Sequence, residues 1–360
     1  MIVIWDWQLS SAHWKLKSKI FYVFLQFIGE LIIQTEVFNN NLSTNSKIRI
    51  IDLFAGIGGI RLGFEKAFND NIACVFSSEI DKHAVKTYIT NFNDVPHGDI
   101  TQIPENHIPS HDIILAGFPC QAFSIAGHKK GFSDTRGTLF FEVVRIANYH
   151  KPKVIFLENV KGFTSHDKGQ TFNTVKNSLE NLGYKIYSKI LNAKDFGAPQ
   201  NRERIYIVGF LNHSTIFNFP EKLVHLVKVF DILDNKVDDK YTISDKLWNG
   251  HQRRKLEHKI KGNGFGYSIF DENSSYTSTL SARYYKDGSE ILIAQSGKNP
   301  RKITPREASR LQGFPDCFKI EVSDVQAYKQ FGNSVCVPVI EAIAKNIFKT
   351  LESNRWWATR

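Results

Sequence analysis

Two short segments place reactive side chains directly after predicted strands. Gly117-Phe118-Pro119-Cys120-Gln121 follows an apolar run that ends at Ala116, so Cys120 lies in a loop, after a proline. Leu157-Glu158-Asn159-Val160 places a carboxylic acid at the end of another apolar run. In open α/β sheets, ligands bind at the edge where the strands end. We therefore predict that Cys120 and Glu158 share one site. Taken alone, the acid also fits a helix-capping role and the cysteine a small buried side chain.

A glycine-rich turn predicts a cofactor site at the same edge. Asp52-Leu53-Phe54-Ala55-Gly56-Ile57-Gly58-Gly59 ends the first apolar run, and Glu79 follows twenty residues later. Glycines let a backbone approach a ligand closely, and an acid at this spacing can accept hydrogen bonds from ribose hydroxyls. The dinucleotide fingerprint would require glycine where this chain has Arg61. The pattern indicates an adenosine-bearing cofactor other than NAD or FAD, with a tight structural turn as the alternative.

Basic residues near these segments favour a phosphate-bearing partner. His128-Lys129-Lys130 and Arg136 follow the cysteine loop, and Gln200-Asn201-Arg202-Glu203-Arg204 precedes a further apolar run. An arginine of the latter segment could hold Glu158 or a phosphate. The whole chain has 46 Lys plus Arg against 36 Asp plus Glu, a formal charge of +10. This excess indicates an anionic partner such as nucleic acid or a membrane surface.

The hydrophobic pattern predicts the elements that must position these segments. Six continuously apolar runs predict buried parallel strands: Ile48–Leu53, Ile72–Phe76, Asp112–Ala116, Val154–Leu157, Ile186–Leu191 and Ile205–Phe210. Helical patterns lie between them: Arg61–Phe68, Leu139–Ala147 and Thr171–Leu182. This alternation predicts a doubly wound α/β domain over 48–210. Residues 211–302 are polar and lack the alternation, which predicts a second, irregular domain, and helical signals return in 303–360.

Residues 1–47 are predicted to be an N-terminal extension that ends in a polar stretch. Its apolar run, Ile20–Ile33, is interrupted by polar residues and is shorter than the roughly 20 residues of a membrane span. We therefore expect a soluble, cytoplasmic protein without a membrane partner. The cysteines lack metal-ligand spacing, which argues against a metal site and a disulfide framework. Three of them are expected to be small buried side chains: Cys74, Cys317 and Cys336.

Six segments together resemble, in order and spacing, the motifs of the bacterial DNA (cytosine-5) methyltransferases. They are Asp52–Gly59, Gly117–Gln121, Glu158–Val160, Gln200–Arg204, Arg310–Pro315 and Gly332–Val335. The resemblance covers Ile48 to about Phe348, and Gly262–Gly266 with Leu280–Gly288 looks like the Dcm-type subgroup. It implies a Rossmann-like methyltransferase sheet with a smaller irregular target-recognition domain, S-adenosylmethionine as cofactor and duplex DNA as substrate. It also implies a monomeric protective methylase of a restriction-modification system, whose cognate endonuclease acts on the same site without direct binding.

The resemblance also assigns roles to residues. Cys120 matches the nucleophile that adds to carbon 6 of cytosine, and Glu158 matches the acid that hydrogen-bonds ring N3. Arg202 and Arg204 belong to one catalytic motif, which places Arg204 near O2 of the base and the thiol. The cofactor residues that it implies are Phe54, Gly56, Gly58, Gly59, Glu79, Ile80, Asp99, Ile100, Pro119, Asn333 and Ser334. Ile80 is a departure, because some relatives place a tryptophan there against the adenine.

The expected DNA contacts come from two regions. Ser124–Thr138 matches the family's mobile loop, which closes over a flipped base, and 211–302 is expected to recognise a short palindrome rich in G and C. The DNA-binding candidates are Gln121, Ser124, Lys129, Arg136, Arg253, Arg254, Arg283 and Lys286. An RNA cytosine methyltransferase is an alternative within the same chemistry. A catalytically inactive DNA-binding protein is a second alternative, which the presence of all the catalytic residues disfavours.

Overall fold

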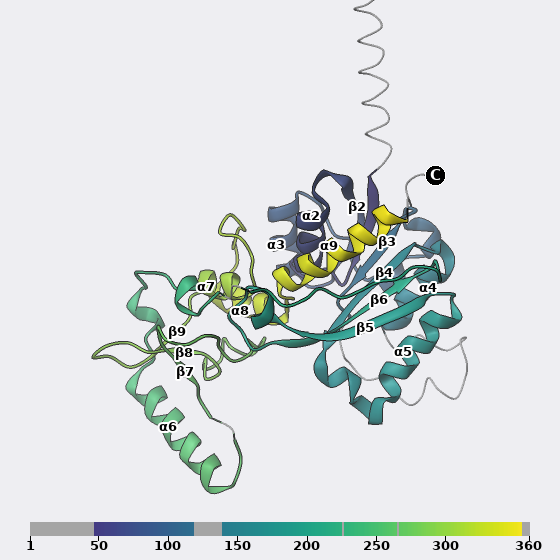
Figure 1. Ribbon diagram of the computed structural model, residues 1–360. Coiled ribbons are helices and arrows are strands. Elements are labelled where there is room, and N and C mark those ends of the chain that lie inside the picture. The colour runs from purple at the N-terminus through teal and green to yellow at the C-terminus, as the bar shows by residue number, and fades with distance from the viewer. Residues whose placement is uncertain (1–46, 119–138, 225–226, 265, 355–360) are drawn as a thin grey trace, which may run out of the picture. The chain divides into compact units, whose positions relative to one another are not determined.

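The computed structural model describes residues 47–118, 139–224, 227–264 and 266–354 (Figure 1). The chain divides after Lys47 into two units, and the fold below is that of Ile48–Arg360. The expected extension, apart from its last residue, and the expected loop Ser124–Thr138 lie outside the described residues. In the described parts of the chain, no helix is both long and apolar enough to cross a lipid bilayer.

A six-stranded sheet in the order β2-β1-β3-β4-β6-β5 forms the centre of this unit (Figure 1). The strands are β1 (Ile48–Leu53), β2 (Ile72–Ser78), β3 (Ile113–Ala116), β4 (Val154–Val160), β5 (Lys185–Asn192) and β6 (Glu203–Phe210). All six predicted strands are present, and the α/β fold class is confirmed. Strands β1 to β4 pair in parallel, so their carboxyl ends share one edge of the sheet.

Strand β6 contradicts the prediction of an all-parallel sheet, because it runs antiparallel to both β4 and β5. The connection between β5 and β6 contains only a short 3-10 turn, Ala193–Phe196, and no crossover helix of the kind that parallel neighbours need. Strand β5 was also expected to be buried, but it lies at the sheet edge and exposes residues 188–190. The reversal brings the beginning of β6 beside the end of β4, where Val160 pairs with Arg204.

Helices cover both faces of the sheet (Figure 1). Outside residues 211–302, the described helices are α2 (Gly59–Phe68), α3 (Lys82–Phe92), α4 (Phe140–His150), α5 (Gln170–Asn181), α7 (Pro305–Leu311), α8 (Asp324–Asn333) and α9 (Val337–Ser353). Of these, α7 and α8 lie beside residues 211–302 and not on a face of the sheet. On one face, α2 and α9 share a core that includes Phe64 and Ile340. On the other face, α4 and α5 bury Val143 and Leu179 against the strands. A Cβ atom at Gly63 would lie only 2.5 Å from the Ile340 side chain, so this glycine permits the close packing of α2 on α9.

Residues 211–302 have little regular structure. They form α6 (Asp245–Ile260) and a three-stranded sheet of β7 (Ile269–Phe270), β8 (Leu292–Ile293) and β9 (Arg301–Lys302). Short 3-10 turns occur along the chain at Asn69–Asn71, Ile100–Gln102, Glu105–His107, Lys161–Thr164, His166–Gly169, Phe230–Ile232 and Asp239–Tyr241. A third hydrophobic core joins this region to the C-terminal helices, since Leu280 and Tyr284 pack in one cluster with Leu311 and Phe331.

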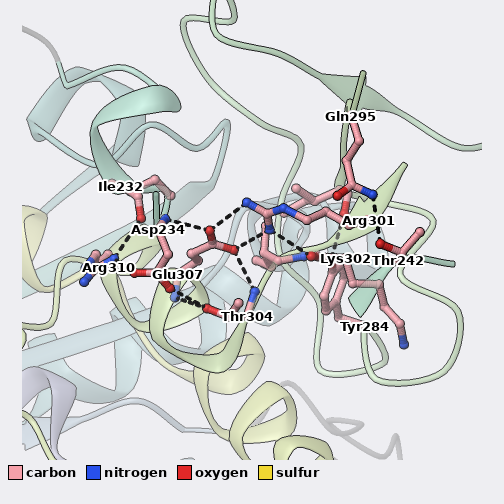
Figure 2. A network of polar contacts seen from close by, with 12 residues as sticks. Ile232, Asp234, Thr242, Tyr284, Gln295, Arg301, Lys302, Thr304, Glu307 and Arg310 are labelled. Carbon is pink, nitrogen blue, oxygen red and sulfur yellow. Dashed lines mark hydrogen bonds and ion pairs between the residues drawn. The ribbon is translucent and has the colours of Figure 1, made fainter. Parts of the chain in front are cut away.

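A buried ion pair between Arg301 and Glu307 connects β9 to α7. Figure 2 shows the Arg301 guanidinium facing the Glu307 carboxylate, with Nη1–Oε2 and Nη2–Oε1 distances of 2.8 and 2.9 Å. The backbone N–H groups of Asp234 and Thr304 donate to the same carboxylate, and Arg310 binds the side chain of Asp234. Glu307 is fully buried, so its charge is compensated entirely by these donors.

The cysteines only partly match the expectation that they are buried. Cys336 is buried and burial raises the pKa of its thiol to about 12, whereas Cys74 is half-buried. Cys317 is exposed, which contradicts the prediction. It lies just after α7, in the turn that follows the Arg310–Pro315 motif, and not within an apolar stripe.

Candidate active site

The turn between β1 and α2 has a backbone shape that its glycines permit. Gly56 and Gly58 have φ angles of 55° and 80°, in the left-handed region that side chains disfavour. A Cβ atom at Gly58 would collide with the Phe92 ring, and one at Gly59 would lie 2.8 Å from Oγ of Ser334. A tight structural turn and a cofactor site were the two alternatives predicted for this segment. Both descriptions apply, because the glycines permit close packing and the turn also lines a cavity.

Glu79, at the end of β2, is tied to the same turn. Its Oε2 accepts a 2.7 Å hydrogen bond from the backbone N–H of Gly56, and its Oε1 accepts from the N–H groups of Ile80 and Asp81 at 2.8 Å. Three backbone donors thus fix the carboxylate. Oε2 accepts only one of them, which leaves it a lone pair for a ligand hydroxyl.

A cavity of about 650 Å³ lies at the carboxyl edge of the sheet. It brings together these residues of the predicted cofactor and catalytic sets: Phe54, Gly56, Gly59, Glu79, Ile80, Asp99, Ile100, Glu158, Arg202, Arg204, Asn333 and Ser334. Gly58 does not line the cavity, and it packs closely against the Phe92 ring. Pro119 and Cys120 lie outside the described residues and follow Phe118, which does line the cavity.

Several lining residues were not predicted from the sequence, and three polar ones lie on α8. Gln326, Lys329 and Gln330 line the cavity together with Asn333. Their spacing of three, four and seven residues puts them on one face of the helix. Counting back by this spacing from Asn333, a predicted cofactor residue, would have identified these three residues from the sequence. Ser78 at the end of β2 was missed as well, and its buried hydroxyl has no hydrogen-bond partner among the described residues.

Glu158 and Arg204 form an ion pair at the cavity. Oε1 of Glu158 lies 3.2 Å from Nε of Arg204, and their side chains are only 11% and 14% exposed. Burial raises the pKa of the Glu158 carboxyl above its usual range, while the charges of Arg204 and Arg202 oppose this shift. The pair confirms the expectation that an arginine of this motif holds Glu158. Burial favours the protonated acid and Arg204 favours the carboxylate, while the contact orients the carboxyl group.

Arg202 has a different environment, although it comes from the same motif. Its guanidinium donates to the backbone carbonyls of Leu280, Gly332 and Ser334 at 2.9, 3.0 and 2.6 Å. Burial lowers its pKa to about 10. Arg202 therefore links the start of β6 to the residues around Asn333 and to the Leu280 segment.

The chain leading to Cys120 is anchored by Asn159. The side-chain amide of Asn159 donates a 3.0 Å hydrogen bond to the carbonyl of Phe118, and its oxygen accepts from the N–H of Val160. The buried Phe118 ring packs against Phe140 and Phe163, with centroid distances of 5.6 Å to each. The residue just before the Pro119-Cys120 pair is thus fixed next to Glu158.

The predicted DNA-binding residues are placed separately from this cavity. Arg253, Arg254, Arg283 and Lys286 are exposed, and none of the four lines the cavity. Arg254 is paired with Asp287 at 3.1 Å. The other four candidates lie outside the described residues: Gln121, Ser124, Lys129 and Arg136. Across the described ranges, no group of three or more histidine, cysteine or acidic side chains is placed to hold a metal ion.

Comparisons with known proteins agree with this geometry. The family described as C-5 cytosine-specific DNA methylase matches residues 48–349. The chain is 63% identical over 314 residues to the type II methyltransferase M.SsoII of Shigella sonnei, covering 86% of this chain and 82% of that protein. It is 62% identical over 306 residues to M.NlaX of Neisseria lactamica, covering 85% and 97%.

A solved structure shares the fold at lower identity. The S. pombe Dnmt2 methyltransferase superposes with a TM-score of 0.70 at 22% identity, covering 86% of this chain and 99% of that chain. The family match and the high identities extend over the sheet, the cavity and the helices that close it. The chain therefore belongs to the C-5 cytosine-specific DNA methylases, the enzymes that transfer a methyl group from S-adenosylmethionine to carbon 5 of cytosine in DNA.

Proposed function

We propose that Cys120, Glu158 and Arg204 carry out the transfer on a cytosine flipped out of a specific short duplex sequence. The observation that supports this most is the buried Glu158–Arg204 pair, which opens into the same cavity as the glycine turn and Glu79. A duplex base cannot reach such a cavity while stacked, so it must rotate out at a cost of a few kcal/mol.

The residues of the cavity fit S-adenosylmethionine. Phe54 and Ile100 offer apolar contact to an adenine, and Glu79 Oε2 has a lone pair for a ribose hydroxyl. Oδ1 of Asp99 is occupied by Thr101, which leaves Oδ2 for the adenine amino group. The unpartnered hydroxyl of Ser78 is a further polar group that a ligand can satisfy. When bound, the cofactor supplies an electrophilic methyl group on a sulfonium sulfur.

Glu158 and Cys120 act in turn on the cytosine ring. The Cys120 thiolate forms a bond to carbon 6, and the electrons displaced from the 5,6 double bond move toward N3, where Glu158 donates its proton. Carbon 5 of the resulting enamine takes the methyl group. A base then removes the carbon 5 proton and N3 returns its proton to Glu158, so that the double bond re-forms and the thiolate is expelled. The raised pKa of Glu158 suits this role, because it favours the protonated form that can donate to N3.

Arg204 and Arg202 have different roles in this mechanism. Arg204 orients the Glu158 carboxyl and brings a positive charge to the side of the ring where O2 becomes electron-rich. Arg202 acts as a positioning residue, because its two terminal nitrogens donate to three backbone carbonyls. It holds the segment that carries Asn333 and Ser334 against the cavity.

The remaining parts of the chain select the substrate. Residues 48–210 and 303–360 form the catalytic part in this proposal, and 211–302 recognise the sequence, with Arg283 and Lys286 on its exposed surface. The relatives are named as type II methyltransferases, which supports a protective role in a restriction-modification system. We infer a cytoplasmic monomer that shares its site with a cognate endonuclease without binding it.

Two measurements test the proposal. Bisulfite sequencing of plasmid DNA from an expressing host should place 5-methylcytosine at one position of one short sequence. The Cys120→Ala variant should lose methyl transfer while its affinity for S-adenosylmethionine stays within about twofold of wild type. Cys317→Ala is the matched control, because that thiol is exposed and lies outside the cavity. Turnover by the Cys120 variant, or methylation confined to an exocyclic nitrogen, would refute the assignment.

A further inference from the structure

Helix α6 carries a basic surface that the active site does not use. Within 245–261, six residues are basic and only Asp245 and Glu257 are acidic. The basic residues are Lys246, Arg253, Arg254, Lys255, Lys259 and Lys261. Of the helix residues, His251 alone is buried, and none of them lines the catalytic cavity. A 17-residue segment therefore supplies a net charge of about +4 out of the chain's +10.

One side of α6 is firmly attached to the chain that follows it. Trp248 packs edge-on against the Tyr267 ring with a centroid distance of 4.8 Å, and Nζ of Lys255 lies 4.2 Å from the same ring. Both terminal nitrogens of Arg254 lie 3.1 Å from Oδ2 of Asp287. Arg254 and Lys255 thus contact the chain that follows the helix, and these contacts attach α6 on this side.

The exposed surface of α6 also has cations without comparable partners, and they are not confined to one face of the helix. Lys246 and Arg253 are seven residues apart and lie on one face, away from His251. Arg253 is 75% exposed and reaches only Glu257, at 3.6 Å, a contact worth little in water. Lys259 and Lys261 are exposed as well, and within the described chain no ion pair holds either of them.

We infer that this outer surface of α6 binds phosphates of duplex DNA outside the recognised sequence. The inference rests on the proposed role of 211–302 in facing DNA. Three of these four exposed cations are lysines, compact point charges that suit phosphates, whereas base edges are read by planar, bidentate side chains. A helix of 16 residues is about 24 Å long, so it can follow about seven base pairs at 3.4 Å each. Such contacts add affinity and leave the choice of sequence unchanged.

The test compares two duplexes that contain the same recognition site. One has about 14 base pairs and the other about 40, and binding is measured at several salt concentrations for wild type and for the Lys246→Gln/Lys259→Gln/Lys261→Gln variant. We expect wild type to prefer the long duplex and the variant to lose that preference, with about tenfold weaker binding at low salt. The slope of log affinity against log salt should shrink by about 2 to 3 for the long duplex. Methylation of the short duplex should be unchanged in rate and position.

A matched control removes three charges elsewhere. Lys176, Lys345 and Lys349 lie on α5 and α9, and changing them to glutamine should leave the preference for long DNA intact. Equal losses in both variants, or a variant that keeps the full salt slope, would overturn the inference. Weaker binding to the short duplex alone would place α6 on the recognised sequence and refute it too. A change in molecular mass by light scattering without a change in DNA binding would make α6 a protein interface instead. Failure of wild type to methylate the short duplex would count against the proposed function, not against α6.

Discussion

Oε1 of Glu158 lies 3.2 Å from Nε of Arg204, across the antiparallel pairing of β4 and β6. The contact is one of two opposite effects on the pKa of Glu158. Burial raises the pKa of Glu158, and the guanidinium limits the rise. The pKa of Glu158 therefore depends on the balance between burial and the positive charge of Arg204, and a substitution of Arg204 removes the second effect.

Glu158→Gln should slow methyl transfer by about 10² to 10⁴, because an amide cannot donate a proton to N3 as the thiolate adds. Binding of S-adenosylmethionine should change little, since the cofactor residues stay intact. Single-turnover rates with saturating DNA measure the chemical step directly. Glu203→Gln is the control, since this neighbouring acid is 40% exposed and pairs with Lys161 instead. A variant with wild-type turnover would show that Glu158 is not the proton donor.

The rate of transfer should fall as the pH rises through the raised pKa of Glu158, because the acid then loses the proton that it donates to N3. Arg204→Gln removes the charge that most opposes the raised pKa, so the pKa rises further and the falling limb moves to higher pH. The overall rate of this variant should also be lower, because the carboxyl is no longer oriented. A pH profile of single-turnover rates separates the two effects. A shift of the falling limb to lower pH would contradict the assigned electrostatics.

The strands and the cofactor turn were predictable because they depend on local sequence. Apolar runs and a glycine turn before Arg61 carry their own signal, and the structure has all six strands. The direction of β6 was not predictable from such runs. It depends on the connection after β5, where a short turn replaces a helix. That reversal matters for chemistry, because it is what brings Arg204 beside the end of β4.

Contacts between residues far apart in the sequence could not be predicted either. Asn159 and Phe118, or Arg202 and Gly332, meet through tertiary packing that no local pattern encodes. The wall formed by α8 was likewise missed, although its spacing from Asn333 was visible. Sequence motifs thus identified most of the charged groups of the site, and the structure supplied the contacts that position them.

Arg202→Lys should destabilise the protein by about 3 kcal/mol, since hydrogen bonds from a charged donor to buried carbonyls contribute about 1.5 to 3 kcal/mol each. A lysine ammonium cannot span the carbonyls of Leu280, Gly332 and Ser334 together. The affinity for S-adenosylmethionine should fall as well, because the segment around Asn333 loosens. Urea unfolding and calorimetric titration measure the two effects. Unchanged stability would mean that the carbonyls find other donors.

Glu307→Gln should be costly because it leaves the Arg301 charge buried without its partner. Removing one member of a buried ion pair typically destabilises by about 3 to 5 kcal/mol. Replacing both residues by apolar side chains of similar size should recover much of that loss. Thermal unfolding of the single and double variants checks this, with Lys298→Gln as the control for an exposed pair. Equal stability of the single variant and wild type would contradict the view that this pair fastens β9 to α7.

Asp52→Asn should stabilise the protein at alkaline pH. Oδ2 of Asp52 accepts a 3.3 Å hydrogen bond from Tyr88, and Oδ1 has no partner in the described parts of the chain. Burial raises the pKa of Asp52 from 3.8 to about 8, against the opposing charge of Arg61. The folded state therefore keeps a proton that the unfolded state loses, and the free energy of unfolding falls by about 1.4 kcal/mol per pH unit between these values.

An asparagine has nearly the same shape and does not ionise, so this pH-dependent cost disappears. The advantage of Asp52→Asn over wild type should grow steadily from pH 5 to pH 8, reaching a few kcal/mol. Urea unfolding at three pH values measures it, and Asp70→Asn, at an exposed position, is the control. If wild type and variant gave parallel curves over this range, Asp52 would be ionised in the folded protein. The Arg61 and Tyr88 network would then have to stabilise the charged carboxylate rather than the neutral acid.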